Sequence, residues 1–152
     1  MIKTHHLAAC ALLASLLSFP VLADESAGMI KNSKGQVSIE RDGKKMVGVV
    51  GTPVLVADRI RTGSDSAVGV TLRDNTLLST GPNSLIVIEK FVFDSSTQDG
   101  KMSIGIRKGT LSVATGKIAK RTPESVDFHT PTSVLGVRGT EFVIEVGAGN
   151  DE

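Results

Sequence analysis

The sequence predicts an all-β protein, folded as a single compact β-sandwich or a short β-solenoid-like roll of about ten short strands. Three observations support this fold class. Apolar and polar residues alternate along several short segments. Turn signals separate these segments at intervals of about eight to twelve residues, as in sandwiches and barrels. Helical periodicity is almost absent.

The predicted strands follow one another from residue 36 to residue 146. The first two, 36–40 and 46–50, flank Asp42-Gly43, a pair that favours a tight hairpin turn. Further turns are predicted at Asp74-Asn75, 81–83, 94–100, Lys108-Gly109 and Gly116. Further strands are predicted at 54–56, 59–63, 68–72, 76–80, 85–93, 101–107, 110–115, 126–129 and 141–146.

Residues 1–23 have the pattern of a secretory signal peptide. Lys3 precedes an apolar run, Pro20 breaks it, and Val21-Leu22-Ala23 places compact residues at the cleavage site. The run is shorter than the roughly 20 residues that a membrane span needs. Cys10 ends a lipobox-like tetrapeptide, but too little apolar sequence precedes it for a lipoprotein leader. We therefore expect an exported domain at 24–152 without a membrane span, ending in a flexible tail at 147–152.

Composition narrows the function of the mature chain. Its 16 acidic residues are balanced by as many basic ones, and cysteine, Trp and Tyr are absent. Nucleic acid is bound mainly through clustered cations and stacking aromatics, so we expect no nucleic-acid partner. Without thiols, neither a disulfide nor thiol chemistry is expected.

The sequence offers little for catalysis or metal binding. His129 is the single histidine after the leader, so a zinc site lacks ligands. No G-x-S-x-G motif is present, which leaves His129 as a partly exposed strand residue. Residues 94–100 lack the alternating ligands of a calcium loop and are expected to form a polar hairpin loop. The sequence thus predicts a protein that is not an enzyme and has no metal or cofactor.

Several segments resemble the FecR domain, the periplasmic sensor module of iron-dicitrate-type signalling. The most specific is 130–143, which reads T-P-T-S-V-L-G-V-R-G-T-E-F-V. Residues 58–66 are similar to the family's d-x-i-x-T-G-x-d-S element, and 68–77 to its alternating strand with a D-N-T turn. Two further segments match family motifs in the same order along the chain: Gly35 to Val37 and Gly109-Thr110-Leu111.

The resemblance implies a periplasmic β domain that senses or binds and does not catalyse. The family often carries this domain on a single-pass regulator with a cytoplasmic anti-sigma region, for which this sequence has no counterpart. We therefore expect a stand-alone exported domain in envelope or iron-related signalling. Its partner would be an envelope or periplasmic protein, a small ligand or a glycan. The alternative is a structural or scaffolding module that docks on an envelope protein or glycan.

One segment carries a specific site hypothesis. Gly136, Arg138, Gly139 and Thr140 place backbone N–H groups, a guanidinium and a hydroxyl close together. A backbone nest beside an arginine suits a carboxylate or a phosphate, so these four residues are the predicted ligand or partner site.

A structural role is the alternative for the same arginine. Arg138 would then bind nearby carbonyls, or pair with Asp58 or Asp65, while the glycines make a tight corner. Asp58, Arg61, Asp65 and Ser66 are themselves predicted to form turns. A basic residue that follows a β-branched one and precedes a glycine recurs at Arg61, Arg107 and Arg138.

Overall fold

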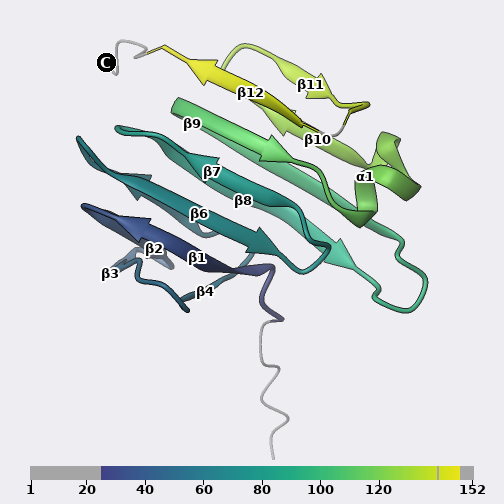
Figure 1. Ribbon diagram of the computed structural model, residues 1–152, viewed down its shortest axis with the longest axis horizontal. Helices are drawn as coiled ribbons and strands as arrows, with labels where there is room; N and C mark the ends of the chain where they lie inside the picture. Colours follow the sequence, from purple (N-terminus) through teal and green to yellow (C-terminus); the bar gives the residue numbers. More distant parts are fainter. Residues whose placement is uncertain (1–24, 140, 148–152) are drawn as a thin grey trace, which may run out of the picture.

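The computed structural model describes residues 25–139 and 141–147. The predicted signal peptide, Thr140 and residues 148–152 of the predicted tail lie outside these ranges. The prediction of an all-β fold is confirmed, because the strands form a strongly curled sheet whose two layers face each other (Figure 1). All strand pairs are antiparallel except β9 with β10.

The long strand β9 (Gly100–Ala114) belongs to both layers. In the first layer the order is β12-β9-β7-β6-β1-β4, and in the second it is β11-β10-β9-β8-β5-β2-β3. The first layer contains β1 (Gly28–Lys34), β4 (Pro53–Val54), β6 (Ala67–Leu72), β7 (Leu77–Thr80) and β12 (Glu141–Val146). The second contains β2 (Val37–Arg41), β3 (Lys44–Val47), β5 (Arg59–Thr62), β8 (Leu85–Phe93), β10 (Val126–His129) and β11 (Val134–Gly136).

The core lies between the two layers. Along β6, Val68, Val70 and Leu72 are buried while the residues between them are partly exposed, which is the alternation predicted from the sequence. Ile104 and Ile106 of β9 and Phe128 of β10 are fully buried in the same cluster. Phe142 of β12 is partly buried and meets the Phe128 ring edge-on at 5.0 Å.

The prediction of a turn at Lys108-Gly109 is wrong. Residues 100–114 form one strand, and Gly109 is the point where it passes from the second layer to the first. Gly109 has a φ of +85°, and a Cβ there would lie 2.6 Å from Ser84 Cα. The glycine therefore permits a close approach between β9 and the start of β8 within a continuous strand.

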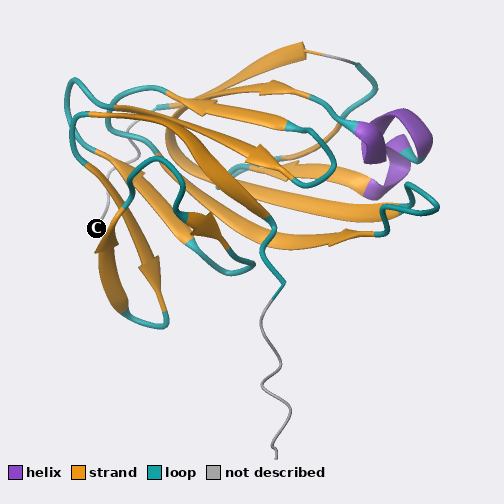
Figure 2. Cartoon of the chain, turned by 60° about the horizontal axis from the view of Figure 1, so that its bottom comes forward, coloured by secondary structure: helices purple, strands orange, loops and turns teal. Residues whose placement is uncertain are grey.

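The predicted hairpin at Asp42-Gly43 is confirmed. Both residues have positive φ, 51° and 73°, as a type I′ turn between β2 and β3 requires. Three elements were not predicted: β1, β11 and the single helical turn α1 (Lys117–Arg121), which is followed by the short 3₁₀ helix η1 (Pro123–Ser125). Figure 2 shows this helical segment at one end of the layers. No helix in the described part of the chain has the length and apolar character needed to cross a membrane.

Candidate functional site

Asp58 is a structural residue. Its side chain is fully buried and accepts two hydrogen bonds from Arg41, from Nε at 2.8 Å and from Nη2 at 2.7 Å. The backbone N–H of Leu55 donates a third at 2.8 Å. Asp58 is thus occupied by Arg41, and the pairing of Arg138 with Asp58 that the sequence suggested does not form.

Thr62 and Ser66 are also structural. Thr62 Oγ1 donates to the Gly81 carbonyl at 2.8 Å and accepts the N–H of Ser84 at 2.9 Å, which ties β5 to the turn before β8. Ser66 Oγ accepts the Gln36 N–H at 2.8 Å. Arg61, which directly precedes Thr62, is exposed on the outer face of the second layer. Asp65 is an exposed turn residue with a φ of 55°, as predicted.

The D-N-T turn holds the helical segment. Asp74 and Thr76 are fully buried and hydrogen-bond to each other at 2.8 Å. Asp74 Oδ2 accepts the N–H of Ile118 at 3.4 Å and Thr76 Oγ1 that of Gly116 at 3.0 Å, so the turn caps α1 from another part of the chain. A Cβ on Gly116 would lie 2.7 Å from the Asn75 carbonyl carbon.

The C-terminal segment differs because it is exposed. Thr130 and Ser133 close a turn between β10 and β11, with the Thr130 N–H donating to the Ser133 carbonyl at 2.8 Å and the Ser133 N–H donating to Thr130 Oγ1 at 3.0 Å. Residues 131–136 are exposed throughout. Val134 is 68% and Leu135 37% exposed on β11, a strand that pairs only with β10 within the described residues.

Of the four predicted site residues, the structure describes three. Gly136 ends β11, and Arg138 and Gly139 lie in the connection to β12. Neither glycine has a left-handed φ, so neither supplies the alternating conformation of a backbone nest. Gly139 also receives a hydrogen bond on its carbonyl from Thr115 Oγ1 at 2.8 Å. Thr140 lies outside the described residues.

Arg138 is exposed and has no hydrogen bond or ion pair with any residue of 25–139 or 141–147. The hollow beside it, about 450 Å³, is also lined by Glu124 and Asp127. Carboxylates next to a guanidinium oppose the binding of a free anion but suit a polar partner that carries both charges. Anion binding at this segment remains a prediction.

A hollow of about 620 Å³ lies between the 130–133 turn and the end of β12. We call it the C-terminal groove. β10 pairs with β9 only as far as Gly105, and β12 pairs with it only from Gly109. Among the described residues, the edge of β9 opposite β8 therefore has no strand partner at 106–108. Leu135, Ile144 and Val146 give the groove apolar walls, and Lys108 adds a positive charge. Its chemistry suits an extended peptide segment.

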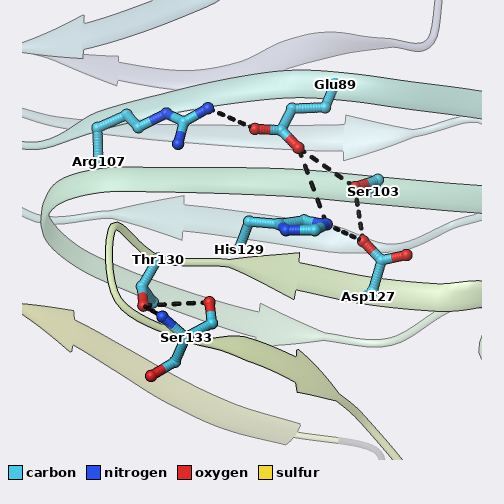
Figure 3. A network of polar contacts seen from close by, with 7 residues as sticks. All are labelled: Glu89, Ser103, Arg107, Asp127, His129, Thr130 and Ser133. Atoms are coloured by element: carbon cyan, nitrogen blue, oxygen red, sulfur yellow. Dashed lines mark hydrogen bonds and ion pairs between the residues drawn. The ribbon is translucent and has the colours of Figure 1, made fainter.

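A polar network crosses the outer face of the second layer (Figure 3). Asp127 Oδ1 lies 2.6 Å from both His129 Nε2 and Ser103 Oγ, and Glu89 pairs with Arg107 at 2.6 Å. In a catalytic triad the histidine stands between serine and aspartate. Here the aspartate stands between the other two, so these three residues do not have the order of a triad. His129 is a partly exposed strand histidine, as predicted.

Residue spacing did not reveal this network. Its members come from three strands, β8, β9 and β10, that only the folded sheet brings together, and Gly105 leaves the space into which Glu89 extends. The polar hairpin loop predicted at 94–100 forms between β8 and β9. In this loop Asp94 Oδ1 accepts hydrogen bonds from the N–H groups of Ser96 and Thr97.

Comparison with known families gives one match: the family described as FecR protein matches residues 58–152. The chain belongs to the FecR family. The match runs from β5 to β12 and includes the buried anchors Asp58 and Asp74 as well as the C-terminal groove. FecR is a non-enzymatic signalling family of the Gram-negative periplasm. No curated protein and no solved structure matched the chain.

Proposed function

We propose that this FecR domain is an exported, non-enzymatic binding and sensing module that docks on an envelope protein through β11, the connection 136–139 and the C-terminal groove. One observation carries the proposal. The upstream family residues Asp58, Thr62 and Asp74 are buried in hydrogen bonds that build the fold, whereas 131–136 is exposed beside the C-terminal groove. Exposed residues within a family signature are available for a partner.

The chemistry of the region favours a protein partner over a small anion or a glycan. Val134 and Leu135 present apolar surface on a short edge strand, and edges of this kind accept an added strand. Glu124 and Asp127 beside Arg138 favour a partner with mixed charge. The described residues offer no exposed aromatic surface on which a sugar could stack, because Phe91, Phe93 and Phe128 are buried, Phe142 is partly buried, and the sequence has no Trp or Tyr.

The predicted leader and the family support a periplasmic location for the chain. A signal peptide at 1–23 would deliver residues 24–152 to the periplasm, where the family functions. Intact-mass measurement of the exported protein is expected to show a chain that begins at Asp24. A mass that retains the leader, or that includes acyl chains on Cys10, would contradict this part of the proposal.

The binding surface is tested by site-specific photo-crosslinking in the periplasm. A crosslinker at Val134 is expected to capture one partner, and a crosslinker at Val92, which is 60% exposed on β8, is the matched control. Arg138→Ala should weaken capture about 5-fold or more, as the loss of an interface arginine does. Its melting temperature should stay unchanged because Arg138 has no partner among the described residues.

Two results would contradict the proposal that this surface binds a partner. One is equal capture from Val92 and Val134, which would show non-specific contact. The other is an Arg138→Ala variant that melts several degrees lower and retains its partner, which would make Arg138 part of the fold.

A further inference from the structure

A group of polar side chains gathers on the outer face of the second layer, at the edge formed by β3, β2 and β5. The strand pairing places Ser38 of β2 opposite Arg61 of β5 on one side and opposite Val47 of β3 on the other. Lys45 lies two residues from Val47 on the same face of β3. Paired residues share a face of the sheet, so Arg61, Ser38 and Lys45 project to the same side.

Arg61 lacks the carboxylate partner that most arginines here possess. Arg41, Arg73, Arg107 and Arg121 each form an ion pair with an aspartate or glutamate. Within residues 25–139 and 141–147, Arg61 forms neither an ion pair nor a hydrogen bond through its side chain, and the same is true of Lys45. Glu40 lies opposite Lys45 in the β2–β3 pairing but forms no ion pair with it, so neither Lys45 nor Arg61 is neutralised by contact with a carboxylate and both contribute a positive potential beside Ser38.

These side chains surround a hollow of about 410 Å³, which we call the β5 hollow. Its lining contains Lys45, Arg61, Gln36 and Ser38 but no aspartate or glutamate. Gln36 lies across Gly63, since a Cβ on that glycine would be 3.2 Å from Gln36 Oε1. The hollow therefore offers ammonium, guanidinium, amide and hydroxyl donors from three sides.

From this arrangement we infer that the β5 hollow binds a phosphate group. Guanidinium groups bind phosphate with two parallel hydrogen bonds, and lysine adds a compact charge. A tetrahedral oxyanion accepts hydrogen bonds in several directions, which matches donors from β2, β3 and β5 better than a planar carboxylate does. Val47, which is 72% exposed in the lining, provides apolar contact for the carbon portion of the ligand. The ligand class is a small phosphate ester or the phosphate of a lipid headgroup.

Arg59 provides a matched control. It is an exposed arginine on the same strand and face as Arg61, but it does not line the β5 hollow and lies opposite Glu40. Arg59→Gln and Arg61→Gln remove the same charge from the same strand. General electrostatic attraction is weakened equally by both, whereas a defined site depends on Arg61 alone.

The probes are glycerol 3-phosphate, followed by NMR titration, and vesicles of phosphatidylglycerol, with phosphatidylcholine vesicles as the control. For a soluble ligand, glycerol 3-phosphate shifts the Gly63 and Ser38 amide signals, and Arg61→Gln weakens binding about 10-fold or more while Arg59→Gln changes it less than about 2-fold. For a lipid headgroup, the same difference between variants is seen only with phosphatidylglycerol vesicles. Either pattern supports the inference.

The inference is overturned if neither probe binds, or if both variants weaken binding equally. Lys45→Gln provides a second check, since it should reduce affinity without changing the melting temperature. The outcome does not depend on the protein partner proposed above, because the C-terminal groove is lined by residues of β9, β11 and β12 and the 130–133 turn.

Discussion

The Asp58–Arg41 pair is the strongest test of how this fold is stabilised. The carboxylate is fully buried, and the Arg41 side chain is 25% exposed. Arg41→Gln would leave a buried carboxylate with only the Leu55 N–H as its donor. Breaking a buried pair by removing one partner costs about 3–5 kcal/mol, because the remaining charge stays desolvated. We expect Arg41→Gln to fall in that range.

Asp58→Asn should cost less, about 2–3 kcal/mol, because water reaches the guanidinium that remains. The double variant should lose less than the sum of the two single variants, with a coupling of at least about 1 kcal/mol, since it leaves no unpaired charge. For a domain of this size, 1 kcal/mol corresponds to roughly 4 °C, so Arg41→Gln should melt about 12–20 °C lower than the wild type.

Urea and thermal unfolding followed by far-ultraviolet circular dichroism measure these differences, because the chain has no Trp or Tyr for fluorescence. Arg121→Gln is the control. It breaks an ion pair with Asp99 in which both side chains are more than half exposed, so the melting temperature should not change. A loss below about 1 kcal/mol for Arg41→Gln, or strict additivity in the double variant, would refute the reasoning.

Three further predictions follow from buried or paired groups. Gly109→Ala should destabilise the protein by about 2 kcal/mol or more in urea unfolding, because its φ is +85° and the new Cβ would approach Ser84; an unchanged midpoint would contradict this account of the β9 bend. Asp74→Ala should cost about 1–3 kcal/mol, since it leaves the buried N–H of Thr76 without its partner and removes the cap of α1, and faster hydrogen exchange in 116–121 would verify the loss. The hydrogen bond from Arg121 lowers the pKa of Asp99, so Arg121→Gln should raise that pKa toward its ordinary value in a carboxyl NMR titration; any stability from the pair is present above the unfolded pKa and is lost as the pH falls through the lowered one.

The sequence predicted the strands whose residues alternate and are bounded by turns. β6 follows directly from its pattern because one of its faces lies against the core. The β2–β3 hairpin follows from its Asp-Gly turn, although all four residues of β3 are exposed. β1 was missed because only Met29 and Ile30 in it are apolar, so alternation is not visible. α1 was missed because a single turn of five residues cannot show helical periodicity.

The error at Lys108-Gly109 has a different cause. A glycine with positive φ is required both in a turn and where a strand bends against another backbone. The residue type alone does not distinguish these cases. The contact that decides is with Ser84, in the turn before β8, and local sequence does not report it. For the same reason the binding of Asp58 by Arg41 was not predicted, although the two residues are only 17 apart.

Arginine recurs after a β-branched residue, and this recurrence shows how much of the structure a local sequence pattern can predict. Ile60 and Ile106 are buried in the core, so alternation places Arg61 and Arg107 on the outer face of the same layer. The pattern therefore predicts where these side chains project. It does not predict their partners: Arg107 pairs with Glu89 from the neighbouring strand, whereas Arg61 has no carboxylate partner among the described residues. An exposed arginine that is already paired has little capacity left for a ligand, so the difference in pairing, and not the shared pattern, makes Arg61 the better candidate for binding.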